Sequence, residues 1–268
     1  MKPLVLLSND DGVHSRGLLL LRDALASIGD VIVVAPETEQ SASSHALSLH
    51  RPLRIREVEA GVYAVDGTPA DCVYIALYSK GRILPRAPSL VVSGVNHGLN
   101  LGQDAFYSGT VAAAREAALR GIPALATSAD RRADLDAVVR ESARVAARLL
   151  ALAGSEEASA ARVSRSASGE SVPPGPLLSL NFPKAWNGTL RVTKTGARLY
   201  EEVVDFRIDP RGREYVWLAG PGVTHEANQG SDTEANDEGV ASLTPLVLDL
   251  TAPAGFPLAT RVAATTAL

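Results

Sequence analysis

The sequence predicts an α/β protein with a Rossmann-like, mostly parallel sheet flanked by helices, followed by a β-rich C-terminal extension that we expect to be used in oligomerisation. Short apolar runs alternate with helical patterns through the first half, as is typical of parallel strands joined by crossover helices. A length of 268 residues suffices for one large α/β domain, or for a core with a smaller appendage.

The first half supplies most of the predicted sheet. Buried strands are expected at 4–7, 31–35, 90–93 and 125–128, helices at 18–28, 68–78, 110–120 and 135–152, and a hairpin between 53 and 65. Thr68, Pro69 and Asp71 are typical of a helix start, since they suit the cap, the first turn and the positive end of the helix dipole. Gly121 and Pro123 mark the end of the Ala-rich helix.

The second half changes in composition. Residues 154–176 are rich in Ser, Ala, Gly and Pro without an apolar period, which predicts a mobile surface loop. Further strands are expected at 177–180, 190–193, 214–218 and 246–250. We therefore divide the chain into a Rossmann-like catalytic core, residues 1–182, and a β-rich extension, residues 183–268, that partly completes the core and mediates subunit contacts.

Composition excludes several classes of protein. A formal net charge of −4 argues against a partner that is a nucleic-acid polymer. The single cysteine, Cys72, rules out an intrachain disulfide and favours a reducing compartment. The apolar run at 4–7 is too short for a signal peptide or a membrane span, so we expect a cytoplasmic protein that does not contact a membrane.

Polar loops follow three of the predicted strands, at residues 8–12, 36–41 and 94–100. The carboxyl ends of parallel strands open onto one ligand crevice, so we expect these loops to converge. Asp10 and Asp11 suit a hard divalent cation, although a turn or helix-capping role before Gly12 is about equally consistent with the dipeptide. Ser41 and Asn96 add neutral oxygen donors.

A phosphate group is the anion that such a site would take. Ser108, Gly109 and Thr110 open the Ala-rich helix, where free N–H groups and the helix dipole favour an anion, while a simple helix cap is the alternative. The phosphate-binding candidates are Asn9, Ser93, Gly94, Ser108, Gly109 and Thr110. The chain has no Walker motif, no GxGxxG after the first strand, no HExxH and no GxSxG.

Taken together, these segments resemble the SurE family of stationary-phase survival proteins with nucleotidase activity. The resemblance rests on motifs that keep their order from residue 4 to about residue 251: Leu7-Ser8-Asn9-Asp10-Asp11-Gly12, Val34-Ala35-Pro36, Gly67-Thr68-Pro69-Ala70-Asp71-Cys72-Val73, Ser93-Gly94-Val95-Asn96, Ser108-Gly109-Thr110-Val111, Asn181-Phe182-Pro183, Asp209-Pro210-Arg211-Gly212 and Asp237-Glu238-Gly239.

This resemblance implies one divalent metal ion per subunit, Mg²⁺ or Mn²⁺, held by Asp10, Asp11, Ser41 and Asn96, with Asp10 and Asp11 as the catalytic residues. It implies hydrolysis of nucleoside 5′-monophosphates, often of 3′-monophosphates, and in some members of short polyphosphate. Homodimers or homotetramers in which C-terminal β extensions embrace a neighbour are also implied.

Two other functions stay open on the sequence alone. One is a phosphatase that forms an aspartyl-phosphate on Asp10, although the usual DxD spacing of such enzymes is absent. The other is a protein that binds and senses nucleotides without hydrolysing them.

Overall fold

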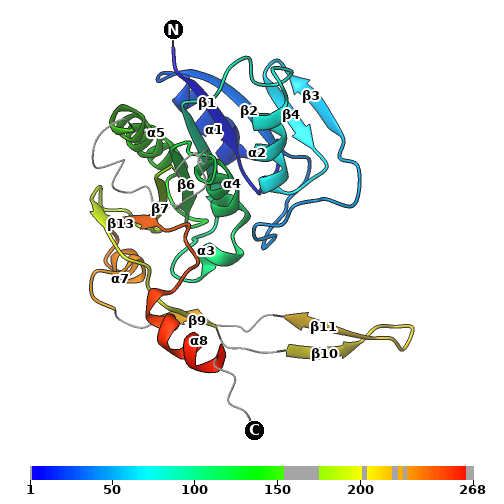
Figure 1. Cartoon of the computed structure of the whole chain (residues 1–268), viewed down its shortest axis with the longest axis vertical. Helices are drawn as coiled ribbons and strands as arrows, with labels where there is room; N and C mark the ends of the chain where they lie inside the picture. Colours follow the sequence, from blue (N-terminus) through cyan, green and yellow to red (C-terminus); the bar gives the residue numbers. More distant parts are fainter. Residues whose placement is uncertain (1, 154–174, 201–203, 219–222, 226–227, 264–268) are drawn as a thin grey trace.

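A nine-stranded sheet forms the centre of the molecule (Figure 1). The structure, a computed structural model, describes residues 2–153, 175–200, 204–218, 223–225 and 228–263. The strand order is β3-β4-β2-β1-β5-β6-β7-β13-β8. Its strands are β1 (Leu4–Ser8), β2 (Asp30–Pro36), β3 (Ile55–Glu59), β4 (Val62–Val65), β5 (Leu90–His97), β6 (Ala124–Ala129), β7 (Leu177–Phe182), β8 (Leu190–Val192) and β13 (Ala241–Leu246).

Most strand pairs of this sheet are parallel, and its two antiparallel pairs are β3 with β4 and β7 with β13. This confirms the predicted mostly parallel sheet. The inner strands, such as β1, are buried along their whole length, which explains why they read as unbroken apolar runs.

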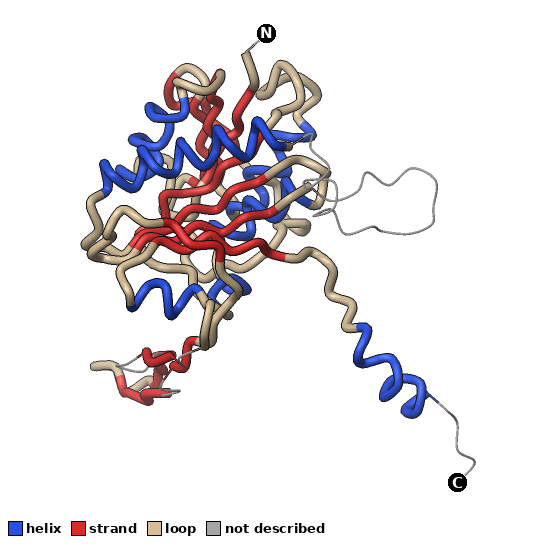
Figure 2. The backbone as a smooth tube through the Cα atoms, turned by 90° about the vertical axis from the view of Figure 1, so that its left-hand side faces the viewer, coloured by secondary structure: helices blue, strands red, loops and turns tan. Residues whose placement is uncertain are grey.

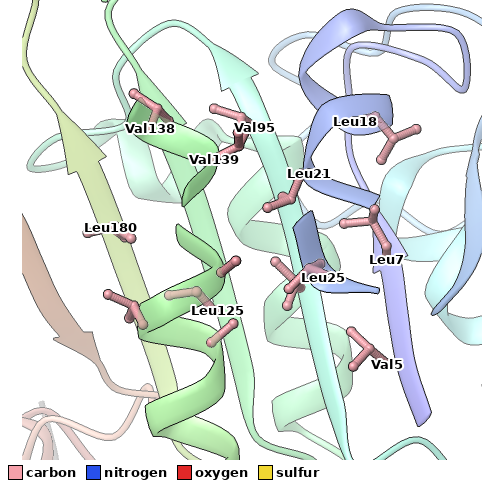
Figure 3. Close-up of a cluster of buried hydrophobic side chains, with 14 of the residues drawn as sticks. Val5, Leu7, Leu18, Leu21, Leu25, Val95, Leu125, Val138, Val139 and Leu180 are labelled. Carbon is pink, nitrogen blue, oxygen red and sulfur yellow. The ribbon is translucent and has the colours of Figure 1, made fainter. Parts of the chain in front are cut away.

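Helices cover both faces of the sheet. On one face, α1 (Arg16–Leu25) packs against α5 (Leu135–Leu152), and on the other α2 (Pro69–Tyr78) packs against α4 (Gly109–Ala118). Figure 3 shows the first of these cores, where Leu21 and Leu25 of α1 and Val139 of α5 lie over the sheet. On the α4 side the second core is lined mainly by alanines, which allow this helix to approach the strands closely.

One crossover has the less common hand. From β1 to β2 and from β6 to β7 the chain moves in opposite directions across the sheet, yet α1 and α5 lie on the same face. From β5 to β6 the chain moves in the same direction as from β6 to β7, but α4 lies on the opposite face. The β6–α5–β7 connection therefore has the opposite hand to both β1–α1–β2 and β5–α4–β6. Because parallel crossovers are almost always right-handed, β6–α5–β7 is the left-handed one.

The C-terminal part both joins the sheet and leaves it. Strands β13 and β8 extend the sheet beyond β7, next to the short helix α7 (Asp232–Asp237). Strands β9 (Arg198–Tyr200) and β12 (Val223–His225) form a small separate sheet, and β10 (Val204–Ile208) pairs with β11 (Glu214–Leu218) in a hairpin. Figure 2 shows this hairpin and α8 (Phe256–Ala263) projecting from the body at separate places.

The predicted strand at 246–250 is wrong. The last strand among the described residues is β13, which ends at Leu246. Its neighbour β7 begins at Leu177, the residue opposite Leu246, so the residues after Leu246 have no strand on that side to pair with. The predicted loop at 154–176 lies mostly outside the described residues, which resume at Gly175.

None of the described helices combines the length and apolar character that a membrane crossing requires. A short helix that the sequence did not predict, α3 (Asp104–Tyr107), lies between β5 and α4.

The start of α2 provides a test of the fold. Asp71 is buried and accepts hydrogen bonds from the N–H groups of Thr68 and Ser48, both at 2.9 Å. Asp71→Ala leaves these two donors without an acceptor, so we expect it to lower the free energy of unfolding by about 2–3 kcal/mol. Urea denaturation measures this loss. The matched control is Asp136→Ala in the exposed first turn of α5, which should change stability by less than about 0.5 kcal/mol. Equal losses in the two variants would contradict this account of the cap.

Candidate active site

The candidate site lies where the sheet changes direction. Strand β1 sits between β2 and β5. The sheet continues to β4 and β3 on the β2 side, and to β6 and β7 on the β5 side. Ligands of open α/β sheets bind in the crevice at such a switch point, beyond the carboxyl ends of the strands. Asp10 and Asp11 follow β1, while Asn96 and His97 end β5.

A cavity of about 890 Å³ opens at this point. It is lined by all four predicted metal ligands and by residues of several loops: Asp10, Asp11, Glu39, Ser41, Ala42, Asn96, His97, Gly98, Asn100, Asp104, Tyr107, Ser108, Arg131, Tyr200 and Leu218. The predicted convergence of the three polar loops therefore occurs in the fold.

Asp10 is fixed by the first turn of α4. The N–H of Thr110 donates to its Oδ2 at 3.0 Å, and the Thr110 hydroxyl donates to its Oδ1. A Cβ on Gly109 would lie 2.9 Å from the Asp10 Cβ and 2.8 Å from the Ser43 hydroxyl. Only glycine at 109 thus lets α4 approach Asp10 this closely. The Asp10 side chain and the Ser43 hydroxyl fill the space beside Gly109.

Burial raises the pKa of Asp10 to about 6, and repulsion from Asp11 adds to the effect while the Thr110 hydroxyl opposes it. Burial also raises the pKa of Asp11, against the lowering effect of the His97 N–H, which donates to Asp11 Oδ2 at 3.0 Å. Two desolvated carboxylates beside one another are unfavourable without a positive charge. Their arrangement fits a divalent cation, which would supply that charge.

Asn96 is oriented by its own loop. The register of β5 against β6 shifts between Ser93 and Asn96, and such irregularities re-aim side chains at the end of a strand. The Asn96 Nδ2 donates to the carbonyl of Gly98 at 2.8 Å, which leaves Oδ1 as the atom that could meet a cation.

The loop that carries Ser41 is held under strain. Ala42 and Ser44 have φ values of 56° and 51°, a left-handed conformation that is unfavourable for residues with a Cβ. The loop is held in place by an interaction of His45 Nε2 with the buried Glu116 of α4 at 2.8 Å. Ser41 donates to Glu39 Oε1 at 2.6 Å.

Several buried polar atoms near these carboxylates have no hydrogen-bond partner among the described residues. They are Asn9 Oδ1, Ser43 Oγ and Ser93 Oγ. Such atoms are rare in folded proteins and call for an explanation, which a bound cation with its waters or a phosphate would provide. Within the described ranges no three His, Cys, Asp or Glu side chains gather as a metal site, so the donor set here is two carboxylates with neutral oxygens.

The six phosphate-binding candidates occupy different positions. Ser108 lines the cavity and caps α4 by accepting from the Val111 N–H at 3.0 Å. The Thr110 donors bond Asp10, and Asn9 Nδ2 donates to Gly12 and Ser15. Ser93 is buried, and a Cβ on Gly94 would clash with the Thr127 carbonyl of β6. Phosphate binding at these residues stays a prediction.

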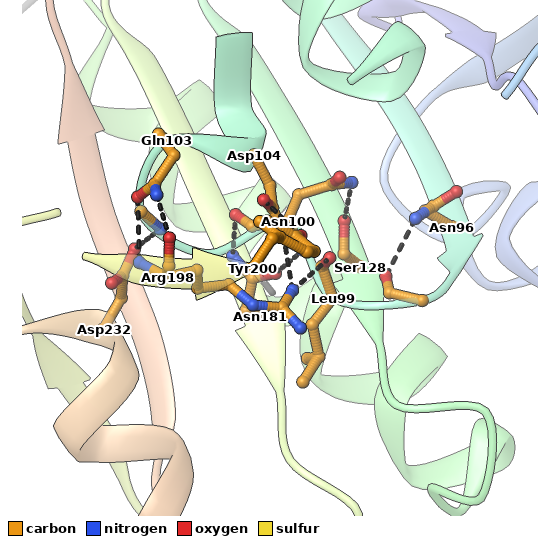
Figure 4. Close-up of polar contacts among 12 residues, drawn as sticks. Asn96, Leu99, Asn100, Gln103, Asp104, Ser128, Asn181, Arg198, Tyr200 and Asp232 are labelled. Carbon is orange, nitrogen blue, oxygen red and sulfur yellow. Dashed lines mark hydrogen bonds and ion pairs between the residues drawn. The ribbon is translucent and has the colours of Figure 1, made fainter. Parts of the chain in front are cut away.

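Sequence reasoning missed part of the cavity wall. Arg131 follows β6, so the rule applied to the first three strands could have found it. Tyr200 reaches the cavity from the C-terminal extension, and no local motif marks it (Figure 4).

The fold and the site define a class: a Rossmann-like α/β protein with an acidic crevice, lined by oxygen donors, at the switch point of its sheet. Within that class, the sequence matches the family described as "Survival protein SurE" over residues 5–202. The chain belongs to the SurE family, as the sequence motifs predicted.

Relatives cover almost the whole chain. A protein of Sorangium cellulosum named "5'-nucleotidase SurE" is 55% identical over 250 residues, which span 93% of this chain and 92% of the relative. A Myxococcus xanthus protein of the same name is 45% identical, over 92% of this chain and 88% of its own. The crystal structure of the SurE protein from Aquifex aeolicus aligns with a TM-score of 0.76 at 34% identity, covering 97% and 99% of the two chains.

The raised pKa of Asp10 predicts a pH-dependent cost in stability. Between its ordinary value of 3.8 and about 6, folded Asp10 binds more protons than the unfolded chain does, so stability falls as the pH rises through this window. Without divalent metal, Asp10→Asn should therefore raise the free energy of unfolding by about 1–3 kcal/mol at pH 7.5. The gain should shrink to about half at pH 5. Urea denaturation in a chelator at both pH values measures it, and a gain independent of pH would contradict the assignment.

Proposed function

We propose that this protein is a divalent-metal-dependent phosphomonoesterase that hydrolyses nucleoside 5′-monophosphates to nucleoside and phosphate. The observation that carries the proposal is the pair of adjacent carboxylates at the switch point and beside the N-terminus of α4, of which Asp10 is buried and Asp11 is half-buried. The name 5′-nucleotidase SurE of the relatives supports it. By the same resemblance we extend the proposal to 3′-monophosphates and short polyphosphate.

One cation per subunit, Mg²⁺ or Mn²⁺, would be held by Asp10, Asp11, Asn96 and Ser41. When bound, such an ion supplies a Lewis acid for the phosphate and lowers the pKa of water. The chain itself contributes orientation: Thr110 fixes both oxygens of Asp10, and His97 fixes one oxygen of Asp11. The N-terminus of α4, which begins at Gly109, favours the negative charge of the phosphoryl group.

The geometry weighs against an aspartyl-phosphate mechanism. Both oxygens of Asp10 accept hydrogen bonds from Thr110, and these reduce the nucleophilicity that attack on phosphorus would need. Asp11 has one oxygen bonded to His97 and lines the open cavity, so it is the better candidate to accept the proton of the attacking water.

The single cysteine, Cys72, is buried and free, which agrees with a cytoplasmic location.

Removing either carboxylate should abolish activity. Asp10→Asn and Asp11→Asn each remove a charge from the proposed cation site, so we expect phosphate release from adenosine 5′-monophosphate to fall at least about 10³-fold. Asn96→Ala and Ser41→Ala, which remove neutral donors, should mainly raise the metal concentration needed for half-maximal activity. The control is Asp23→Asn at an exposed position of α1, which should not change turnover. Near-normal turnover of both Asp variants at saturating metal would refute the site.

We also propose that the β10–β11 hairpin mediates a homodimer or homotetramer. The hairpin exposes apolar residues along both strands, including Phe206, Ile208 and Trp217, whose side chains are 64%, 71% and 60% exposed. An isolated two-stranded hairpin has little stability of its own, and apolar patches of this kind usually mark an interface. A second copy of the chain would cover this surface and complete the fold of the extension.

Light scattering should report at least a dimer. Trp217→Asp, together with Phe206→Asp, should shift the population towards monomers at micromolar concentration, because a charge would be buried in the interface. A matched control is Tyr78→Asp, since Tyr78 of α2 is 53% exposed and lies away from the hairpin. A wild-type protein that is monomeric at all accessible concentrations would contradict the proposal.

A further inference from the structure

The cavity at the switch point is lined by two chemically different kinds of side chain. Asp10, Asp11, Ser41 and Asn96 supply oxygen donors. The remaining wall includes Tyr107 of α3 and Tyr200 of β9, which supply aromatic rings. A volume of about 890 Å³ is in the range of sites for whole small molecules and exceeds what a phosphate group needs. The cavity therefore suits a ligand with a charged end and a flat apolar end.

Tyr200 is held rigidly although it comes from the extension. Its hydroxyl donates to Asp104 Oδ1 at 2.5 Å, and the Arg198 guanidinium, which pairs with Asp104, lies 5.6 Å from the centre of its ring. Figure 4 shows Tyr200, Arg198 and Asp104 together beside Leu99 and Asn100, in the loop that follows β5. Arg198 lies over the ring of Tyr200, yet Tyr200 is still 45% exposed. The face of the ring away from Arg198 is therefore the one that a ligand would contact.

The backbone under Tyr200 is equally well fixed. The Arg198 N–H donates to Gln103 Oε1 at 2.8 Å, and Gln103 Nε2 donates back to the Arg198 carbonyl. Asp232 accepts from the N–H groups of Gly102 and Gly196 at 2.9 and 2.7 Å, which fastens the segment before β9 to the α3 loop. The cost of ordering this wall is thus met in the folded protein before any ligand binds.

Tyr107 is the more open of the two rings. Its side chain is 63% exposed, and none of the described aromatic or cationic side chains packs on its ring. Its backbone is fixed, since its carbonyl accepts from the Ser44 N–H at 2.9 Å, in the loop that also carries Ser41. A large exposed aromatic side chain in a cavity wall is unfavourable in water and favourable against a flat ligand.

We propose that Tyr107 and Tyr200 form the subsite for the nucleobase, with Tyr107 as the main stacking surface. The inference rests on the proposed nucleotidase function and adds how the substrate is recognised. Stacking on aromatic rings accepts every base, because every base has a π face. Apart from its hydroxyl, Tyr107 has no group that could form a hydrogen bond with the edge of a base, so we expect stacking on it to discriminate weakly among bases. A phosphate ester without a base cannot stack on the ring, so we expect strong discrimination between nucleotides and such esters.

A pair of substrates separates this subsite from the phosphate site. We would measure kcat and KM for adenosine 5′-monophosphate and for ribose 5-phosphate, which lacks the base. Tyr107→Ala should lower kcat/KM for the nucleotide roughly 5- to 150-fold, mostly through KM, and change it less than about twofold for ribose 5-phosphate. Tyr107→Phe, which keeps the ring, should behave as wild type with both substrates.

The neighbouring Phe106 provides a matched control. It is 62% exposed in the same short helix, but it lines a different cavity, together with Arg115 and Lys194. Phe106→Ala should therefore leave both substrates unchanged. Equal losses on the two substrates in Tyr107→Ala, or the same selective loss in Phe106→Ala, would overturn the proposal.

A binding measurement distinguishes failure of the subsite from failure of the proposed function. Adenosine carries no phosphate, and its dissociation constant can be followed by ligand-observed NMR without turnover. Tyr107→Ala should raise this constant at least fivefold over that of the wild type. If the wild type binds adenosine in this way but hydrolyses no nucleotide, the function is wrong and the subsite stands. If the variant binds adenosine as well as the wild type, the subsite is wrong.

Discussion

The contact between Asp10 and the first turn of α4 is the interaction on which the site depends. It joins the end of β1 to a helix that begins about a hundred residues later, through two hydrogen bonds from Thr110. Gly109 makes this approach possible, and the alanines of α4 let the whole helix lie close to the sheet. A bulkier helix would move its positive end away from the carboxylates, so the cation site and the anion site share one packing constraint.

The central sheet was predictable from sequence because buried parallel strands are continuous apolar runs, as in β1, and because capping residues such as Thr68 act locally. The same reasoning located Asp10, Asp11, Ser41 and Asn96, since the carboxyl ends of neighbouring strands must meet. The last strand was misplaced because Val247, Leu248 and Leu250 are as apolar as a strand requires. Only the length of the partner β7 decides where pairing stops.

Side chains whose role depends on distant partners could not be predicted. Thr110 reads as a helix-start residue, and nothing near it in the sequence shows that it bonds Asp10. Tyr200 stands in a segment without a motif, and it reaches the cavity only because Gln103 and Asp232 hold β9 against the α3 loop. Composition suggests a boundary between a catalytic core and an appendage near residue 182. The cavity is nevertheless lined by residues from both sides of that boundary, since Tyr200 and Leu218 belong to the appendage.

The left-handed β6–α5–β7 crossover has a consequence for the order of folding. A right-handed crossover is favoured by the twist of its own strands, but this unit lacks that local preference. It must take its hand from the packing of α5 on α1, where Val139 shares a core with Leu21 more than a hundred residues earlier. Contacts of such sequence separation form slowly and need their template in place. Synthesis from the N-terminus presents β1 and α1 first, so vectorial folding on the ribosome supplies that template before α5 emerges.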